Sequence, residues 1–159
     1  MLIGIISDTH DNMPMLRKAV TFLNERKVAH VIHAGDFTSP FTFRALKDLA
    51  CDFTGIYGNN DGERVLLQKL SKQRIFTQPY ILDLAGRKIV IMHEHQVVDA
   101  LADSGHYDLV IYGHTHKQDI RREGKTLVIN PGESTDWLTG QGHVVILDLE
   151  TMEYQIIPL

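Results

Sequence analysis

The chain has 159 residues, 43% of them hydrophobic and 23% charged, with a formal net charge of −4 and one cysteine, Cys51. This length predicts a single domain over residues 1–159, and an acidic chain whose one basic cluster is Arg121-Arg122 argues against an extended nucleic-acid surface. The sequence shows no transmembrane-length apolar segment, basic leader or second cysteine, and so predicts a cytoplasmic protein without membrane contact, internal disulfide or cysteine-rich zinc site.

Strands and helices alternate through the first half of the predicted structure. Residues 13–27 have apolar side chains at helical spacing, and Pro14 suits the first turn of a helix. Asp11 and Asn12 precede this helix, and we expect them to cap it. In chain order we expect a strand at residues 2–7, the helix at 13–27, a strand ending near residue 34, a helix at 39–50, a strand from about residue 52 and a polar helix from about 63 to 72.

The second half is dominated by predicted hairpins. We expect hairpins that turn at Ala85-Gly86, near Gly124-Lys125 and around Glu150-Thr151, a helix from about 97 to 104, and a strand at 108–112. Strands that first alternate with helices and then pair with one another predict an α/β fold, in which two sheets pack face to face with helices outside. In such folds ligands bind at the carboxyl ends of the strands.

Five of the predicted strands end in polar residues that are able to bind metal. On an extended backbone, residues i and i+2 point to the same side, so His114 and His116 would enter one pocket. Three of the groups follow a glycine, whose missing Cβ lets the chain turn sharply or an ion approach the backbone. The five groups are Asp8-Thr9-His10, Gly35-Asp36, Gly58-Asn59-Asn60-Asp61, His93-Glu94-His95 and Gly113-His114-Thr115-His116.

A single motif of this kind is more often a cap or turn, but five at one edge would leave buried carboxylates and imidazoles unpaired without cations. The seven candidate ligands suit two divalent ions that share a bridging carboxylate. Nitrogen and oxygen ligands without thiolate favour Mn²⁺, our first expectation, or Fe, Co, Ni or Zn. Paired ions attract phosphate and hold the attacking and leaving oxygens of an in-line displacement. The candidates are Asp8, His10, Asp36, Asn59, His93, His114 and His116.

The order Asp-x-His, Gly-Asp, Gly-Asn-x-Asp, His, Gly-His-x-His resembles the calcineurin-like metallophosphoesterases. The small size and the GNND motif are most similar to the short prokaryotic phosphodiesterase branch, which is related in fold to the retromer subunit of the same superfamily. The resemblance runs from Ile3 to about Gly132. It implies a four-layer α/β/β/α sandwich of two mixed sheets.

The resemblance also implies roles for the ligands and a mechanism. Asp36 would bridge the two ions, and a metal-bound hydroxide would attack phosphorus in line. One ion would be held by Asp8, His10, Asp36 and His116, and the other by Asp36, Asn59, His93 and His114.

Three further residues are expected to assist catalysis. Asp61 would orient a neighbouring ligand, and His95 could face the pocket and touch substrate. Much of the superfamily has histidine where this chain has Asn60, and an amide can donate a hydrogen bond but cannot act as a general acid. We therefore expect leaving groups of low pKa, such as aryl or nucleotidyl oxygens.

These features predict a metal-dependent phosphoesterase, with diesters favoured over monoesters and a phosphate-ester small molecule or nucleotide as substrate. The alternative is a non-catalytic protein-interaction scaffold that keeps its metal site. Intact ligands favour the enzyme, and the exposed sheet edges make a homodimer plausible. Outside the motifs, His33 is expected as a core or second-layer residue, and His30, His106 and His143 as surface or turn residues. Trp137 is expected over the core or in a subunit contact, and Glu133 is not named as a ligand.

Overall fold

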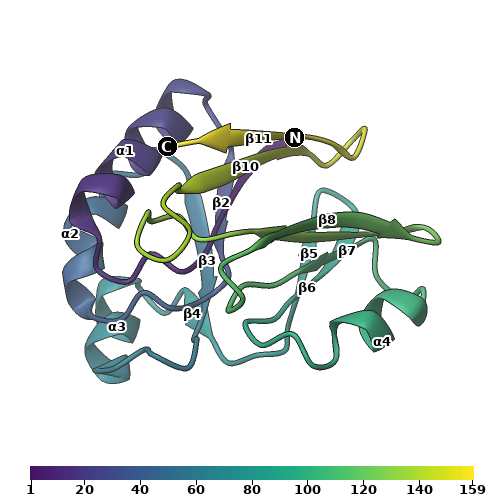
Figure 1. Ribbon diagram of the computed structural model, residues 1–159, viewed down its shortest axis with the longest axis horizontal. Helices are drawn as coiled ribbons and strands as arrows, with labels where there is room; N and C mark the ends of the chain where they lie inside the picture. Colours follow the sequence, from purple (N-terminus) through teal and green to yellow (C-terminus); the bar gives the residue numbers. More distant parts are fainter.

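Two mixed β-sheets face each other in the computed structural model, which describes residues 1–159 (Figure 1). The first sheet has the strand order β11-β10-β1-β2-β3-β4. Strands β1 to β4 are parallel to one another, and β10 is antiparallel to both of its neighbours, β1 and β11. The strands of this sheet are β1 (Leu2–Ile6), β2 (His30–His33), β3 (Asp52–Ile56), β4 (Ile75–Phe76), β10 (His143–Asp148) and β11 (Glu153–Pro158).

The second sheet has the order β5-β6-β7-β9-β8, and its central strands β6, β7 and β9 are parallel. The register aligns Ile91, Ile111 and Ile129 near the carboxyl ends of these three strands. The residues that follow them are therefore delivered to one edge. The strands are β5 (Tyr80–Leu84), β6 (Arg87–Ile91), β7 (Leu109–Ile111), β8 (Gln118–Glu123) and β9 (Thr126–Pro131).

Helices cover the outer face of each sheet, which completes the α/β/β/α order of layers (Figure 1). Helices α1 (Met13–Glu25), α2 (Phe43–Leu46) and α3 (Arg64–Leu70) lie over the first sheet, and α4 (Val98–Asp103) lies over the second. Isoleucines such as Ile5 fill the space between the sheets. The apolar strands thus bury both faces, as their continuous hydrophobic runs predict. None of the helices has the length and hydrophobicity that crossing a membrane requires.

Helix α1 begins where the sequence predicts. The Asn12 side chain accepts a hydrogen bond from the N–H of Met15, and Pro14 occupies the first turn. Asp11 makes no such bond, so only one of the two expected caps is used. The three predicted hairpins are confirmed as β5–β6, β8–β9 and β10–β11.

Several expectations are wrong in detail. The helix expected at 39–50 is a 3₁₀ turn at Pro40–Thr42 followed by α2, because the Asn24 side chain binds the Asp48 carbonyl and the Ala50 N–H. The two-residue strand β4 was not expected. His30 is buried in β2 and bonds to Thr54 Oγ1 at 2.9 Å, so it is not a surface residue.

Candidate metal centre

The seven predicted metal ligands lie together at the edge where the parallel strands of both sheets end. Asp8 and His10 follow β1, Asp36 follows β2, Asn59 follows β3, His93 follows β6, and His114 and His116 follow β7. Two groups of carboxylates and imidazoles have ligand atoms within 4.8 Å of one another, namely Asp8, His10 and His116, and Asp8, Asp36 and His93. The topology therefore brings residues from both sheets to one place.

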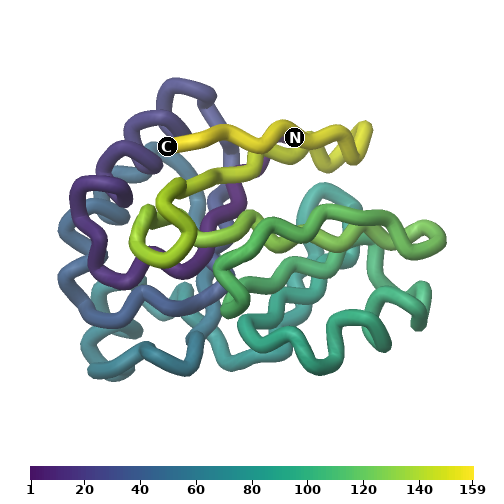
Figure 2. The backbone as a smooth tube through the Cα atoms, in the orientation of Figure 1, coloured from purple at the N-terminus to yellow at the C-terminus, as the bar shows by residue number.

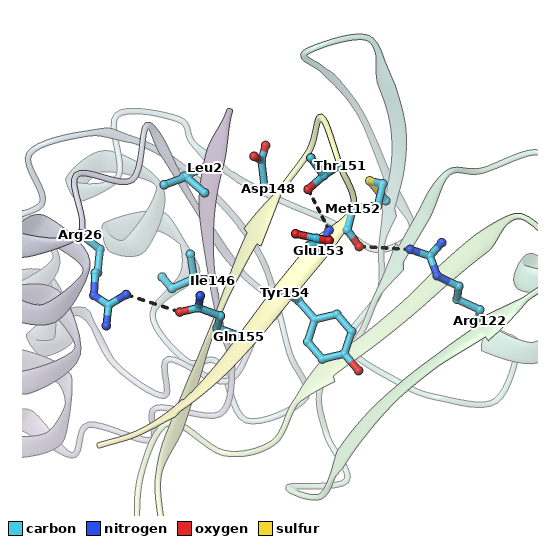
Figure 3. A pocket seen from close by; sticks show the side chains of 10 residues that line it. All are labelled: Leu2, Arg26, Arg122, Ile146, Asp148, Thr151, Met152, Glu153, Tyr154 and Gln155. Carbon is cyan, nitrogen blue, oxygen red and sulfur yellow. Dashed lines mark hydrogen bonds between the residues drawn. The ribbon is translucent and has the colours of Figure 1, made fainter.

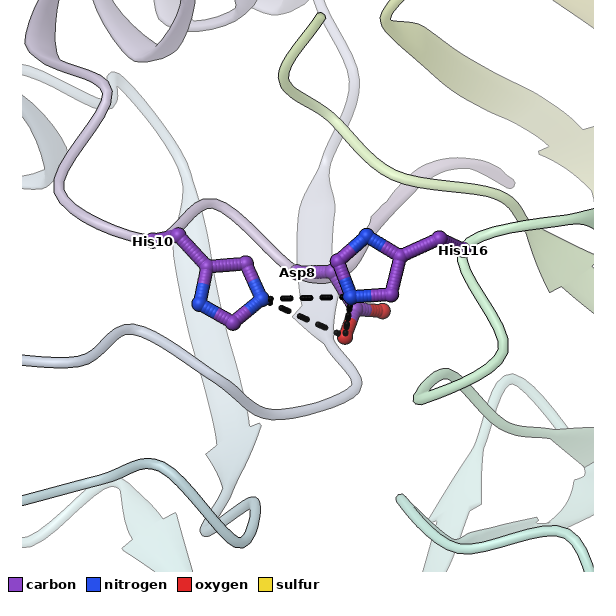
Figure 4. Close-up of side chains that lie close together, drawn as sticks. All are labelled: Asp8, His10 and His116. Atoms are coloured by element: carbon purple, nitrogen blue, oxygen red, sulfur yellow. Dashed lines mark hydrogen bonds and ion pairs between the residues drawn. The ribbon is translucent and has the colours of Figure 1, made fainter. Parts of the chain in front are cut away.

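The first group surrounds a small space between β1 and β7. His10 Nε2 lies 3.3 Å from His116 Nε2, and the two rings stack with their centroids 5.1 Å apart. Asp8 Oδ1 lies 3.8 Å from the His10 nitrogen and 3.6 Å from the His116 nitrogen. Figure 4 shows the three side chains pointing toward one another. Two imidazole nitrogens and a carboxylate oxygen form a donor set that a borderline divalent ion prefers.

In the second group, His93 Nε2 faces oxygens of Asp36 and of the neighbouring Asn59. The Nδ1 of His93 donates to the Ala34 carbonyl at 2.8 Å, so the Nε2 of the neutral ring carries a lone pair. That Nε2 faces Asn59 Oδ1 at 2.9 Å and Asp36 Oδ2 at 3.3 Å. Atoms with only lone pairs repel one another unless a positive charge lies among them, either a proton or a metal ion. This arrangement fits a bound cation.

One oxygen of Asp36 lies between the two groups. Its Oδ2 is 3.6 Å from His10 Nε2 and 3.3 Å from His93 Nε2. The second group is extended by His114, whose Nδ1 lies 2.9 Å from Asn59 Oδ1. Two carboxylates are therefore in a position to serve both groups: Asp8, which belongs to each of them, and Asp36, whose Oδ2 approaches a histidine of each.

Burial and hydrogen bonding set the protonation of the acidic pair at the centre. Burial raises the pKa of Asp8 above its ordinary value. Burial would also raise the pKa of Asp36, but hydrogen bonds with His93 and Asn60 hold it far below the usual range. Burial opposes the charged form of His93, but Asp36 and Asp8 raise its pKa overall. The buried carboxylates thus attract positive charge to the site.

The backbone at the site is strained in the left-handed region. Five of the seven predicted ligands have positive φ, which costs a non-glycine residue about 1–2 kcal/mol, and such strain gathers at functional sites. The five are Asp8 (52°), His10 (40°), Asp36 (60°), His114 (69°) and His116 (59°).

The glycines of the motifs are required by neighbouring side chains. A Cβ at Gly113 would overlap the Ser7 hydroxyl and lie 2.8 Å from Asp8 Oδ2. A Cβ at Gly35 would lie 2.6 Å from His93 Nδ1, and the φ of Gly35 is +100°. The sequence predicted a sharp turn or the approach of an ion at these glycines; in the structure it is the side chains of Ser7, Asp8 and His93 that approach the backbone.

Asp61 and Asn60 hold the loop that carries Asp36. Asp61 is buried and accepts hydrogen bonds from the N–H groups of Asp36 (3.1 Å), Thr38 (2.7 Å) and Gly58 (2.7 Å), while burial raises its pKa. Asn60 donates from its backbone and its side chain to the two oxygens of Asp36, at 2.8 and 2.7 Å. Both residues therefore touch the bridging candidate or its backbone.

His95 lies at the rim of the site. Its exposed ring stacks on that of His114, with centroids 5.7 Å apart and planes 18° from parallel. This position leaves His95 open to solvent beside the second group.

Glu133 is a functional residue that sequence reasoning missed. It is fully buried, and its Oε2 lies 3.0 Å from His116 Nδ1. A carboxylate only accepts, so His116 carries its proton on Nδ1 and directs a bare Nε2 into the site. Burial would raise the pKa of Glu133, but hydrogen bonds from Thr139, His116 and Leu138 hold it below its ordinary value. The signal was available, because Glu133 follows β9, the parallel neighbour of β7.

A separate hollow of about 640 Å³ lies along β10 and β11, away from these ligands (Figure 3). Its two arginines are already engaged, Arg26 with Gln155 at 3.4 Å and Arg122 with the Met152 carbonyl at 3.1 Å. Neither of the two candidate metal-binding groups lies in this hollow; both lie at the strand ends.

The two-sheet fold, with carboxylates and imidazoles clustered at its strand ends, has the architecture of a phosphoesterase domain with a candidate metal site. The family model described as the calcineurin-like phosphoesterase superfamily domain matches residues 1–152. The chain belongs to the calcineurin-like phosphoesterase superfamily.

Individual relatives agree with this assignment. The chain is 41% identical to a protein of Methanocaldococcus jannaschii named phosphodiesterase, over all of this chain and 99% of that one. A solved structure described as a novel archaeal phosphodiesterase superposes with a TM-score of 0.93 at 42% identity and covers both chains completely. Vps29 of Entamoeba histolytica, solved in complex with zinc, has a TM-score of 0.75 at 23% identity and covers 99% of this chain and 91% of its own; at that identity it shows the fold alone.

Proposed function

We infer that the chain is a metal-dependent phosphodiesterase whose single domain spans residues 1–159. The observation that carries this inference is the convergence of His10 Nε2, His116 Nε2 and Asp8 Oδ1 on one space beside the acceptor cluster around His93. A diester preference is supported by the relative at 41% identity that is named phosphodiesterase.

Residues of both groups would hold two divalent transition ions, with Mn²⁺ as the first candidate and Fe, Ni, Co or Zn as others. Asp36 would bridge them, since its Oδ2 lies within 3.6 Å of both His10 and His93. When bound, the ions would supply the positive charge and Lewis acidity that bind a phosphate ester and activate water. Asp8, His10, Asp36 and His116 would hold one ion, and Asp36, Asn59, His93 and His114 the other.

The remaining residues would orient these ligands and the substrate. Asp61 keeps the loop of Asp36 in place through three backbone hydrogen bonds, and Asn60 holds both Asp36 oxygens. His95, exposed beside His114, would contact the ester. The Asn60 amide has no acidic proton to give to a leaving oxygen, so we expect aryl or nucleotidyl leaving groups to react faster than alkyl ones.

The test is the initial rate on bis(4-nitrophenyl) phosphate with added Mn²⁺, then with chelator, and with Asp36→Asn as the control. We expect turnover that requires metal and falls at least about 100-fold in the variant. Equal rates for alkyl and aryl phosphomonoesters would contradict the expected leaving-group preference.

The alternative is a protein-interaction scaffold that retains its metal site. It predicts that two ions bind per chain, measured by elemental analysis, while no diester is hydrolysed. Metal binding with turnover would exclude it. The intact donor set of both groups favours the enzyme, because a scaffold has no need of strained ligand backbones.

A further inference from the structure

The loop between β9 and β10 presents an exposed aromatic ring beside the candidate metal centre. Trp137, the one tryptophan of the chain, is 61% exposed. Its ring lies 6.4 Å from that of His10, with the two planes 24° from parallel. His10 stacks in turn on His116. The indole therefore continues a stack of rings that starts among the predicted metal ligands.

The protein holds this loop in place on both sides of Trp137. Before it, Asp136 accepts a hydrogen bond from the Asn12 side chain at 3.0 Å. After it, Leu138 and Thr139 donate their N–H groups to buried Glu133 at 3.0 and 2.6 Å. In Figure 2 the loop curls beside the segment that joins β1 to α1. The loop backbone that carries Trp137 is therefore already ordered, and ligand binding at the indole would not have to order it.

The backbone N–H of Trp137 is hydrogen-bonded within the loop, while its ring keeps an open face. The backbone N–H donates to Thr135 Oγ1 at 3.0 Å. No partner other than His10 lies against the ring among the aromatic and cation contacts of the structure. A large aromatic surface left open to solvent next to a polar site is typical of ligand recognition.

We propose that Trp137 is a specificity-determining residue that stacks on a planar aromatic group of the substrate, such as an aryl ring or a nucleobase esterified to the phosphate. This inference rests on the proposed function and specifies its substrate class. The phosphate would sit at the strand ends, and the aromatic group would extend past His10 onto the indole. Stacking on aromatic side chains tolerates any flat ring, because every base or aryl group has a π-face.

The small size of the patch favours a single ring as its occupant over a second protein chain. Within the loop only Leu138, which is 73% exposed, adds another large exposed apolar side chain. The remaining exposed ones lie on other elements, such as Phe41 before α2 and Tyr154 on β11. A stable interface buries about 800 Å² per partner, which two side chains do not supply.

The kinetic test uses two diesters with the same leaving group, 4-nitrophenyl phenyl phosphate and 4-nitrophenyl methyl phosphate. The chemistry at phosphorus is shared, and only the group that stays on the phosphate changes. We expect Trp137→Ala to lower the phenyl-to-methyl ratio of kcat/KM about tenfold, chiefly through KM. Trp137→Phe should keep most of the ratio, and Tyr154→Ala, which removes an exposed aromatic ring far from the site, should leave it unchanged.

A binding test uses the emission of the single tryptophan and does not need turnover. The Zn²⁺-loaded protein is titrated with AMP and with ribose 5-phosphate, which carries the same sugar phosphate without the base, and then with phenyl phosphate. Quenching by AMP and phenyl phosphate but not by ribose 5-phosphate would support stacking. A response to only one of the aromatic ligands would tell a nucleobase from an aryl group.

The outcomes separate the two proposals. Unchanged kcat/KM for both diesters in Trp137→Ala overturns the stacking and leaves the phosphodiesterase intact, whereas an equal fall for both diesters would assign the stacked ring to the 4-nitrophenyl group that they share. If the wild type hydrolyses neither diester, the proposed function fails, and the emission titration alone tests the stacking. If neither AMP nor phenyl phosphate then quenches the emission, the stacking is overturned as well. Emission that changes on dilution together with the sedimenting mass would assign Trp137 to a contact between two copies, and would overturn it as well.

Discussion

Replacing Glu133 by glutamine isolates the control that this residue exerts on His116. Glu133 Oε1 accepts hydrogen bonds from Leu138 N–H and from the N–H and hydroxyl of Thr139, and Oε2 from His116 and Thr135. A glutamine amide has one oxygen. We expect this oxygen to accept from the backbone N–H groups of Leu138 and Thr139, which turns the NH₂ group toward His116. The NH₂ donates to Nδ1, so the proton of His116 moves to Nε2, the atom that faces Asp8.

Metal binding would have to reverse that tautomer against the new hydrogen bond. Loss of a partner of this kind weakens metal affinity about 10–100-fold, or about 1.4–2.8 kcal/mol. Isothermal titration of the metal-free protein with Mn²⁺ measures the affinity. We expect Glu133→Gln to weaken one of the two binding events by this factor and to lose about 2 kcal/mol of stability, because a charge-assisted acceptor is removed.

The matched control is Glu150→Gln, an equally conservative change at an exposed turn residue between β10 and β11. Its titration should coincide with that of the wild type. Wild-type affinity for both ions in a folded Glu133→Gln protein would refute the role given to Glu133.

Three further predictions concern pH, packing and metal removal. Burial lowers the pKa of His33 from 6.5 to about 3, so between these pH values the unfolded chain binds a proton at His33 and the folded chain does not. The contribution of His33 to the free energy of unfolding is therefore complete above pH 6.5 and decreases toward pH 3, by up to about 5 kcal/mol. Urea unfolding should show a shallower fall for His33→Asn, and parallel curves would contradict this. Gly113→Ala would displace Asp8 and should reduce metal content after dialysis at least about tenfold, whereas Gly62→Ala, with its nearest neighbour 3.7 Å away, should not. Mn²⁺ at about 100 times its Kd should stabilise the protein by about 2.7 kcal/mol, about 5–10 °C in Tm. An equal shift in Asp36→Asn would place the ion elsewhere, and an equal shift in excess chelator would show that Mn²⁺ binding is not its cause.

Elements with a strong local pattern were predictable, and those that depend on distant contacts were not. The cap and first turn of α1 lie within three residues of one another, and two of the three hairpins combine apolar runs with a glycine turn. The helix expected at 39–50 stops early because Asn24, a residue of α1, binds the Asp48 carbonyl and the Ala50 N–H. The local sequence around residue 48 does not show that a side chain of α1 will bind there.

The histidine positions show the same limit. His33 was expected in the core, and it is buried, bonded to Thr9 Oγ1 and to the Gly35 N–H. His30, three residues earlier in the same strand, was expected at the surface and is buried against Thr54 of β3. Both faces of β2 are covered, as its apolar run predicts. His30 is the first residue of this strand, and the run does not show that the cover extends to the strand's first residue.

The candidate ligands could be read from the sequence, because each follows a strand and parallel strands deliver their carboxyl ends to one edge. Which atoms meet there was decided by the tertiary structure. His10 and His116 are 106 residues apart, and Asn12 and Asp136 are 124 apart. The tautomer of His116 and the position of Trp137 both depend on buried Glu133 and the loop that it holds. Such contacts form only when two sheets pack together, since no local propensity encodes the distance between their ends.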